Sequence, residues 1–245
     1  MRELRLIESS SSRAGRQFPP VLERDLHQFI DVVTRGLPGP PGEAWVIPEM
    51  PSPLGLPDFV VLIGGESWFR ARSAINIAPV LAEADCVTLA ALHPQRSLSR
   101  AAVARRLGWE GVRLDPIVDR LIRSGMIQEA STGTLRQTPG IEPSGRLMAV
   151  ETKIKDWRRA VRQGRSYRTW SDNYVVILGE VGPVALARAQ GEVTSDGGGL
   201  YADGRWLARP VKRQAVDARR LLGFEHLFAA LSHVHPSEAM NSSRP

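Results

Sequence analysis

The sequence has one cysteine, no long hydrophobic run and very few lysines. The single cysteine, Cys86, lies in an apolar stretch and has no second cysteine with which to form a disulfide or a thiolate metal cluster. No stretch has the length and apolar character of a membrane span, and residues 1–10 lack the uninterrupted apolar segment of a signal peptide. We therefore expect a cytoplasmic protein, in a reducing compartment, that has no membrane partner.

Several motifs of common enzyme classes are also missing. There is no phosphate-cradling P-loop, no nucleotide-binding glycine fingerprint and no convincing serine, histidine and aspartate arrangement. The sequence therefore gives no support to ATP-driven or acyl-transfer chemistry.

Lysine is scarce, whereas arginine is abundant. The three lysines are Lys153, Lys155 and Lys212. Arginine cannot replace lysine where a site needs a compact ammonium with an adjustable pKa. Lys153 is the lysine that falls within a distinctive motif, so it is a candidate for chemistry.

The overall composition is that of a globular protein. The chain has 245 residues, of which 42% are hydrophobic and 24% charged, enough for one large domain or two small ones. The formal net charge is +6 and the isoelectric point is near 10.2. This excess suggests a polyanionic partner such as nucleic acid, although a charge spread evenly over the surface would contribute only to solubility.

The stretch Leu147–Ile154 alternates in the two-residue period of a β-strand. Glu151 and Lys153 therefore share one face of a strand that is otherwise apolar enough to be central. Such a pair is costly unless the two groups neutralise each other or are used. A simple ion pair at the end of the strand is the alternative to a functional role.

A second buried strand is predicted at Phe59–Ile63, and Pro57 and Asp58 precede it directly. If the two strands are neighbours, Asp58 meets Glu151 at their ends. Two carboxylates and a backbone carbonyl form the hard, all-oxygen environment that Mg²⁺ or Mn²⁺ prefers.

The order proline-aspartate, then Glu151, Thr152 and Lys153, resembles the PD-(D/E)XK nuclease superfamily. The helix that follows carries Gln163 and Tyr167 at the Gln-x-x-x-Tyr spacing of several branches of that superfamily. The resemblance covers nearly the whole chain. It implies an α/β fold with a restriction-endonuclease-like mixed sheet flanked by helices.

The resemblance also implies roles for particular residues. Asp58, Glu151 and the Thr152 carbonyl would bind Mg²⁺ or Mn²⁺, and Lys153 would position or help to deprotonate the attacking water. Gln163 and Tyr167 would help to orient the DNA backbone. Glu23, on the first predicted helix, which Pro19 and Pro20 introduce and Gly36 ends, is a candidate further ligand, since acidic residues there often face the metal in the superfamily. Its alternative role is to complement the dipole of that helix.

Between the two strands lies a segment with a pattern of its own. A helix near Ile77–Leu92 is followed by a second helix that Ser99 caps and Gly108 ends, and by a third near Val112–Ser124. Two short strands at residues 126–129 and 134–137 complete it. The segment resembles a winged helix-turn-helix domain, in which residues 112–124 would be the recognition helix. We expect residues 77–141 to fold alone.

The charges of this insert allow two kinds of partner. DNA contacts are expected from four arginines: Arg113, Arg120, Arg123 and Arg136. Asp115 and Asp119 lie on the same helix and would oppose the approach of DNA. A protein-binding winged helix is therefore the alternative.

A basic helix is predicted at Asp156–Trp170, after the Glu151 strand. Arg158, Arg162 and Arg165 fall on one face of it and are expected to follow DNA phosphates, unless the face is merely solvated. The remaining predicted elements are a strand at Asn173–Leu178, a short helix at Pro183–Gln190 closed by Gly191, outer strands at Val193–Asp196, Leu200–Ala202 and Trp206–Ala208, and a helix at Ala215–Val234.

The sequence thus predicts a metal-dependent DNA endonuclease. Its core is split into residues 1–70 and 144–235, an insert occupies 71–143, and a flexible tail follows from 236 to 245. Two rival functions remain open: a non-catalytic DNA-binding regulator that uses the nuclease-like core as a scaffold or dimerisation platform, and a protein-recruiting adaptor. A homodimer is compatible with any of them.

Overall fold

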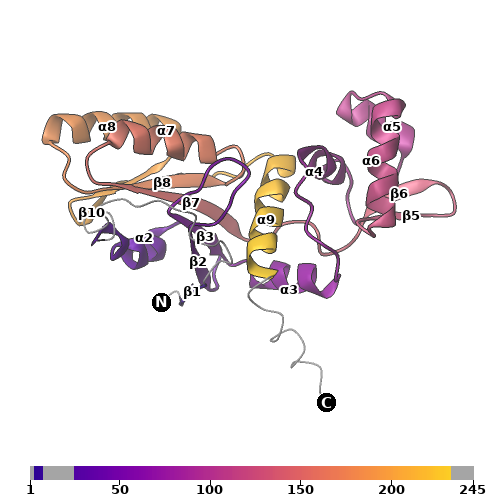
Figure 1. Cartoon of the computed structure of the whole chain (residues 1–245), viewed down its shortest axis with the longest axis horizontal. Coiled ribbons are helices and arrows are strands. Elements are labelled where there is room, and N and C mark those ends of the chain that lie inside the picture. Colours follow the sequence, from indigo (N-terminus) through magenta and orange to yellow (C-terminus); the bar gives the residue numbers. More distant parts are fainter. Residues whose placement is uncertain (1–2, 8–24, 233–245) are drawn as a thin grey trace, which may run out of the picture.

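The computed structural model describes residues 3–7 and 25–232. Glu23 and the predicted tail at 236–245 lie outside the described residues. Within the described part, seven strands form one mixed sheet in the order β1-β2-β3-β7-β8-β9-β10 (Figure 1). Their bounds are β1 Leu4–Leu6, β2 Ala44–Pro48, β3 Phe59–Ile63, β7 Arg146–Lys153, β8 Asn173–Leu178, β9 Gly199–Ala202 and β10 Arg205–Ala208.

Strand β7 lies in the middle of this sheet. It pairs antiparallel with β3, so that Phe59 lies opposite Val150, and parallel with β8. Every residue of β3 and β8 is buried, and Lys153 at the end of β7 is the first residue of that strand to emerge. Strands buried on both faces are continuous hydrophobic runs, which is why the sequence located β3 and β8 correctly, whereas β7 was located by its two-residue alternation.

Helices cover both faces of the sheet. One face is covered by α2 (Ile30–Gly36), which shares an apolar cluster with the odd-numbered residues of β3. The other face is covered by α7 (Trp157–Tyr167), α8 (Pro183–Asp196), α3 (Glu66–Ala74) and α9 (Asp217–Ser232). The expected α/β class with a mixed, helix-flanked sheet is thereby confirmed. None of the described helices has the length and apolar character that crossing a membrane requires.

A second region occupies the chain between α3 and β7. Its elements are, in order, α4 Glu83–Ala90, β4 Leu98–Ser99, α5 Arg100–Leu107, α6 Gly111–Arg123, β5 Ile127–Glu129 and β6 Thr134–Gln137. The three strands form a separate sheet in the order β4-β6-β5. The Ser99 side chain accepts a hydrogen bond from the Ala102 amide, and Gly108 ends α5 in the left-handed conformation, both as the sequence predicted.

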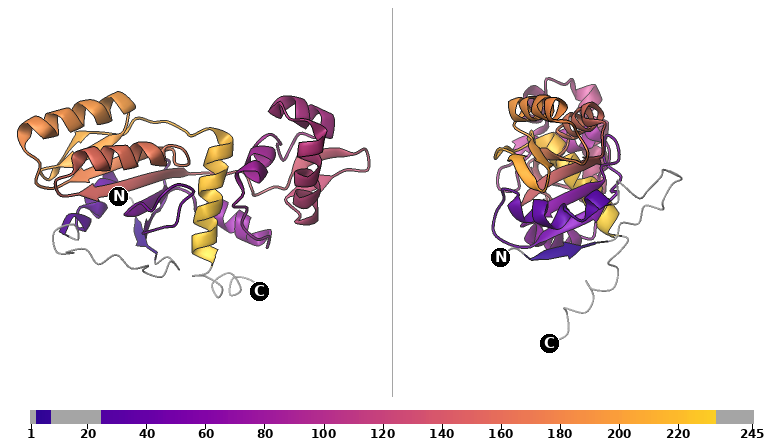
Figure 2. Two further views of the ribbon diagram at one scale, coloured as in Figure 1. Left: turned by 45° about the horizontal axis from the view of Figure 1, so that its top comes forward. Right: turned by 90° about the vertical axis from the view of Figure 1, so that its left-hand side faces the viewer.

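Helix α9 stands between the large sheet and this second region (Figures 1 and 2). It packs on α4, and its Leu221 and Leu222 belong to the apolar cluster of the second region, whereas Phe224 and Leu227 belong to that of the large sheet. Residues 77–141 alone would therefore lack two of their core side chains. The expectation that this segment folds by itself is not supported by the packing.

The structure differs locally from the sequence prediction in three positions and adds two elements that were not predicted. Helix α3 was missed, and α4 begins only at Glu83. Helix α8 continues through Gly191 to Asp196, so the strand predicted at Val193–Asp196 is helical. Gly197, not Gly191, ends α8 in the left-handed conformation that glycine adopts without strain. Strand β1 was not anticipated either.

Candidate active site

The candidate site lies where β3 begins and β7 ends. Because the two strands are antiparallel and Phe59 is opposite Val150, the residue before Phe59 lies beside the residues after Val150. The structure therefore brings Asp58 next to Glu151 and Thr152. Glu151 and Lys153 have the same parity as Leu147 and Ala149, whose side chains pack on the face that carries α3 and α9.

Asp58 joins the ends of the two strands. Its Oδ2 atom accepts hydrogen bonds from the Thr152 amide at 2.6 Å and from the Thr152 hydroxyl at 2.7 Å. The carboxylate is about a quarter exposed, with 26% of its side-chain surface accessible. Its second oxygen remains available for another partner, since an ionised carboxylate accepts several bonds.

Glu151 is almost entirely buried, with 2% of its side chain exposed. Burial, and then the negative charge of Asp58, raise the pKa of Glu151 to about 7. Three interactions act against this rise: the charge of Lys153, a hydrogen bond from Lys153, and a hydrogen bond that the Tyr167 hydroxyl donates to Oε2 at 2.8 Å. The carboxyl is consequently poised to change its charge near neutral pH.

Lys153 lies at the point where the other groups converge. Its Nζ atom is 3.0 Å from Glu151 Oε1, 2.8 Å from the Thr152 carbonyl oxygen and 4.0 Å from Asp58 Oδ2. These are the three oxygen groups that the sequence predicted as metal ligands. In this structure they surround an ammonium.

The donor set fits a hard divalent cation in its chemistry, because two carboxylates and one carbonyl gather around a single positive charge. Binding of Mg²⁺ or Mn²⁺ there would require the Lys153 ammonium to turn away from these oxygens. Within residues 3–7 and 25–232, no group of three or more histidine, cysteine, aspartate or glutamate side chains could hold a metal ion. A centre here would therefore rely on the backbone carbonyl and on water to complete its ligands.

Helix α7 contributes to the site the two side chains that the sequence predicted, those of Gln163 and Tyr167. Tyr167 and Gln163 lie one helical turn apart, and burial followed by the charge of Glu151 raises the pKa of Tyr167. A hydrogen bond from Gln163 acts on that pKa in the opposite direction. The Gln163 Oε1 atom is buried and has no hydrogen-bond partner. Such an atom in a native site calls for an explanation, for which a ligand or water is a common reason.

A part of the site that sequence analysis missed is the loop between β2 and β3, residues 49–58. A Cβ atom placed on Gly55 would lie 3.2 Å from Tyr167 Cε1, so the loop backbone crosses directly over this tyrosine. Gly55 also has φ +88°, which glycine alone adopts readily. Three prolines and a glycine between two strands were the available signal, but nothing local indicates what the loop crosses.

The arginines of the basic helix differ in what they contact. Arg158 and Arg162 are exposed, and the Arg158 guanidinium lies 5.0 Å from the centre of the Trp157 ring. Arg165 instead pairs with two acids of α8, Glu192 at 3.1 Å and Asp196 at 2.5 Å. Arg165 thus holds two helices together, which sequence analysis did not foresee.

The arginines of the second region divide in the same way. Arg120 pairs with the buried Asp85 and fastens α6 to α4. Arg113 lies 4.3 Å from the centre of the Trp109 ring, Arg136 donates a hydrogen bond to Gln128 at 2.9 Å, and Arg123 is exposed.

The two acids of α6 are partly neutralised. Arg100 pairs with Asp119 at 2.8 Å and with Asp115 at 3.6 Å. Their repulsion of a polyanion is therefore weaker than the sequence alone suggested.

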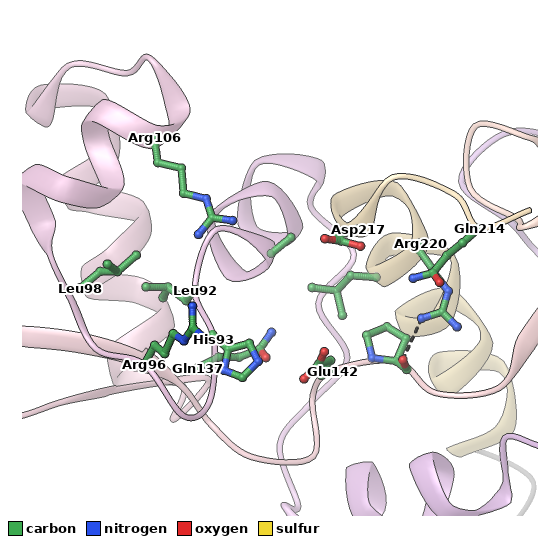
Figure 3. A pocket seen from close by; sticks show the side chains of 13 residues that line it. Leu92, His93, Arg96, Leu98, Arg106, Gln137, Glu142, Gln214, Asp217 and Arg220 are labelled. Atoms are coloured by element: carbon green, nitrogen blue, oxygen red, sulfur yellow. Dashed lines mark hydrogen bonds between the residues drawn. The ribbon is translucent and has the colours of Figure 1, made fainter.

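The two described pockets are lined by residues other than those of the candidate site. A pocket of about 350 Å³ lies instead between α9 and the second region (Figure 3). Its arginines and acids face one another across the gap: Arg106 comes from α5, and Asp217 and Arg220 come from α9. Arg220 is held by the Pro143 carbonyl at 2.7 Å and by Asp172. None of the predicted catalytic residues lines this pocket.

Comparisons with known proteins add no relative to this geometry. No family model matches the sequence, and neither the curated proteins nor the solved structures contain a match.

Proposed function

We propose that this protein is a metal-dependent DNA endonuclease, with a restriction-endonuclease-like core and a winged helix that contacts DNA. The observation that carries the proposal is the convergence of Glu151, the Thr152 carbonyl and Asp58 on one point, 3.0, 2.8 and 4.0 Å from the Lys153 ammonium. If the Lys153 ammonium turns aside for a divalent cation, these oxygen atoms would hold the cation with a lysine beside it, an arrangement suited to metal-assisted phosphodiester hydrolysis.

Each residue has a task in this proposal. Asp58, Glu151 and the Thr152 carbonyl would hold Mg²⁺ or Mn²⁺, which when bound polarises the scissile phosphate and stabilises the leaving oxygen. Lys153 positions the attacking water and can accept or donate a proton there. Tyr167 fixes the Glu151 carboxylate through its 2.8 Å hydrogen bond, and Gln163 in turn contacts Tyr167.

The second region supports a role in DNA binding. Its order of helix, strand, helix, helix, strand, strand is that of a winged helix, and α6 takes the place of the recognition helix. Arg113, Arg123 and Arg136 are exposed there, whereas Arg120 is engaged by Asp85. We assign phosphate contacts to the exposed arginines and a structural role to Arg120.

A non-catalytic DNA-binding regulator is the second candidate, and one observation favours it. Lys153 is already paired with Glu151 at 3.0 Å, so the carboxylates have a cation without any metal. In that case the core would serve as a scaffold or a dimerisation platform. Binding to DNA would then occur with no hydrolysis.

Incubation with plasmid and short duplex DNA in Mg²⁺, Mn²⁺ or EDTA distinguishes the two. The nuclease proposal expects cleavage that needs the metal and is lost in Asp58→Ala, Glu151→Ala and Lys153→Ala. Lys155→Ala is the matched control, because Lys155 is 75% exposed and pairs only loosely with Glu180 at 3.7 Å. DNA binding without cleavage in either metal supports the regulator, and full cleavage by Asp58→Ala places the site elsewhere.

A further inference from the structure

The loop over the candidate site carries two exposed leucines. We call residues Pro51–Pro57 the rim loop. Within it, Leu54 is 50% exposed and Leu56 is 48% exposed. Half-exposed leucines are common on protein surfaces, but these two flank a glycine that crosses a charged site. The position of these two leucines beside the candidate site is more informative than their exposure.

The rim loop is held in one shape. It contains three prolines, Pro51, Pro53 and Pro57, whose rings fix the backbone angle φ. The carbonyl of Gly55 accepts hydrogen bonds from the Ser52 hydroxyl at 2.7 Å and from the Ser52 amide at 3.4 Å. A rigid loop loses little entropy when it binds, so its leucines are presented in advance for a ligand.

Both ends of the rim loop are anchored in the core. Met50 on one side and Pro57 on the other are buried, and the Glu49 amide donates to the Asp58 carbonyl at 3.1 Å. The loop therefore projects as one body from the start of β3.

The position of the loop connects it to the site. The Cβ position of Gly55 lies 3.2 Å from Tyr167 Cε1 and 3.9 Å from the Tyr167 hydroxyl, which binds Glu151 at 2.8 Å. Asp58 follows Leu56 by two residues. The two leucines thus flank, in the chain, the glycine that packs on Tyr167, the residue that binds Glu151.

We propose that the rim loop is an apolar wedge that packs against an unstacked nucleobase beside the scissile phosphate. The preferred substrate is then DNA with unpaired nucleotides, such as a flap, a bulge or a junction, rather than a continuous duplex. This inference rests on the proposed nuclease function. It adds the structure of the substrate, which neither the metal centre nor the arginines specify.

The physical reason is the match between surfaces. In a continuous duplex the base faces are stacked, so leucines near the phosphates would meet only charged oxygens and water. Opening a paired step costs free energy, whereas an unpaired base already exposes its apolar face. Contact with that face is favourable for any base, which makes the wedge selective for structure and not for sequence.

The test uses one DNA sequence as a full duplex and as a duplex with an unpaired 2-aminopurine in a bulge. Wild-type protein is compared with Leu54→Ser/Leu56→Ser, with the conservative Leu54→Met/Leu56→Met, and with Leu81→Ser. Leu81 is also 48% exposed but lies in the segment before α4, outside the rim loop. Binding is measured in EDTA, and cleavage is measured in Mg²⁺.

The expected result is that wild-type protein binds the bulged DNA about tenfold more tightly than the duplex, and that the serine variant loses this preference. The 2-aminopurine fluorescence changes with wild-type protein and with the methionine variant, but not with the serine variant. Leu81→Ser behaves like the wild type. Leu81→Ser also cleaves the full duplex at the wild-type rate.

Three outcomes overturn the inference. If wild-type protein cleaves DNA in Mg²⁺ but the serine variant keeps the preference for bulged DNA, the wedge is wrong and the nuclease function stands. If no DNA is cleaved or bound by any of the four proteins, the nuclease proposal fails and the wedge fails with it. Capture of a protein partner that depends on Leu54 and Leu56, without any effect on DNA, also overturns it.

Discussion

Two buried glutamates in this molecule are held in opposite ways. Glu225 of α9 receives the Arg72 guanidinium at 2.7 and 2.9 Å and the Val80 amide at 2.7 Å, so its charge is matched by fixed donors. Glu151 lies beside a second carboxylate, Asp58, and faces a flexible lysine. The first arrangement joins two parts of the fold. The second is unfavourable in itself, as expected of a group that the protein uses for binding or chemistry.

Loss of Arg72, the fixed donor to Glu225, should have the largest effect on stability. Arg72→Ala leaves Glu225 buried without its cation, and we expect the free energy of unfolding to fall by about 3–5 kcal/mol. Chemical denaturation measures this change. Arg70→Ala is the matched control, because Arg70 is an exposed arginine of the same helix. Equal losses in the two variants would show that the buried pair is not a structural link.

For the Glu151 carboxyl we expect a change in stability of the opposite sign, because loss of its charge should stabilise the protein. Its pKa is raised from 4.5 to about 7, so between these pH values the folded protein binds a proton that the unfolded chain has lost. Stability therefore falls as pH rises from 4.5 to 7, by about 3 kcal/mol in total. Glu151→Gln removes this dependence and stabilises the metal-free protein above pH 7.

Denaturation curves at pH 5, 6, 7 and 8 in EDTA test this expectation. Glu225→Gln is the comparison, since it loses a satisfied charge and should be destabilised throughout this range. The expectation is contradicted if the stability of the wild-type protein does not decline between pH 5 and 7, or if Glu151→Gln leaves that decline in place.

The hydrogen bond from Tyr167 to Glu151 gives a finer test of how the two buried glutamates differ. Tyr167→Phe removes the 2.8 Å hydrogen bond to Glu151, and a bond to a charged group contributes about 1.5–3 kcal/mol. The pKa of Glu151 should then rise further, so the decline in stability that begins near pH 4.5 ends at a higher pH and is larger in total. Tyr201→Phe, in the cluster on the opposite face of the sheet, should leave that pH unchanged.

The smallest effect concerns arginines on the surface of α7. Arg158→Gln/Arg162→Gln should weaken DNA binding about tenfold and reduce the slope of log affinity against log salt by about two. Arg165→Gln should leave the slope unchanged, because Arg165 already pairs with Glu192 and Asp196. Fluorescence titrations at several salt concentrations give both values. If Arg165→Gln lowers the slope as much as the double variant does, then Arg165 does not differ from Arg158 and Arg162 in its contact with DNA.

Much of the candidate site was predictable because it depends on local pattern. The alternation around Glu151 and the apolar run after Asp58 identify two strands, and antiparallel pairing then brings their ends together. The helical spacing of Gln163 and Tyr167 places both on one side of α7. Local pattern identifies the strands and the helix, whereas the pairing of the two strands joins distant parts of the chain and was suggested by the resemblance to the nuclease superfamily.

The parts that sequence analysis missed depend on partners far away in the chain. Arg72 and Glu225 are separated by 153 residues, and without that pairing the short helix α3 has no obvious reason to bury an arginine. Arg120 and Arg165 are ordinary surface residues by sequence, and only the fold supplies Asp85 and Asp196. Gly55 likewise shows its importance only through Tyr167.

Helix α9 has a consequence for the order in which the protein is made and folded. It supplies Phe224 and Leu227 to one apolar cluster and Leu221 and Leu222 to the other. During synthesis, both clusters are incomplete until residues 217–232 have left the ribosome. Until then, the earlier parts of the chain would expose apolar surface. Domains that fold one after another during synthesis avoid such exposure. The two regions should therefore unfold together in a single cooperative transition.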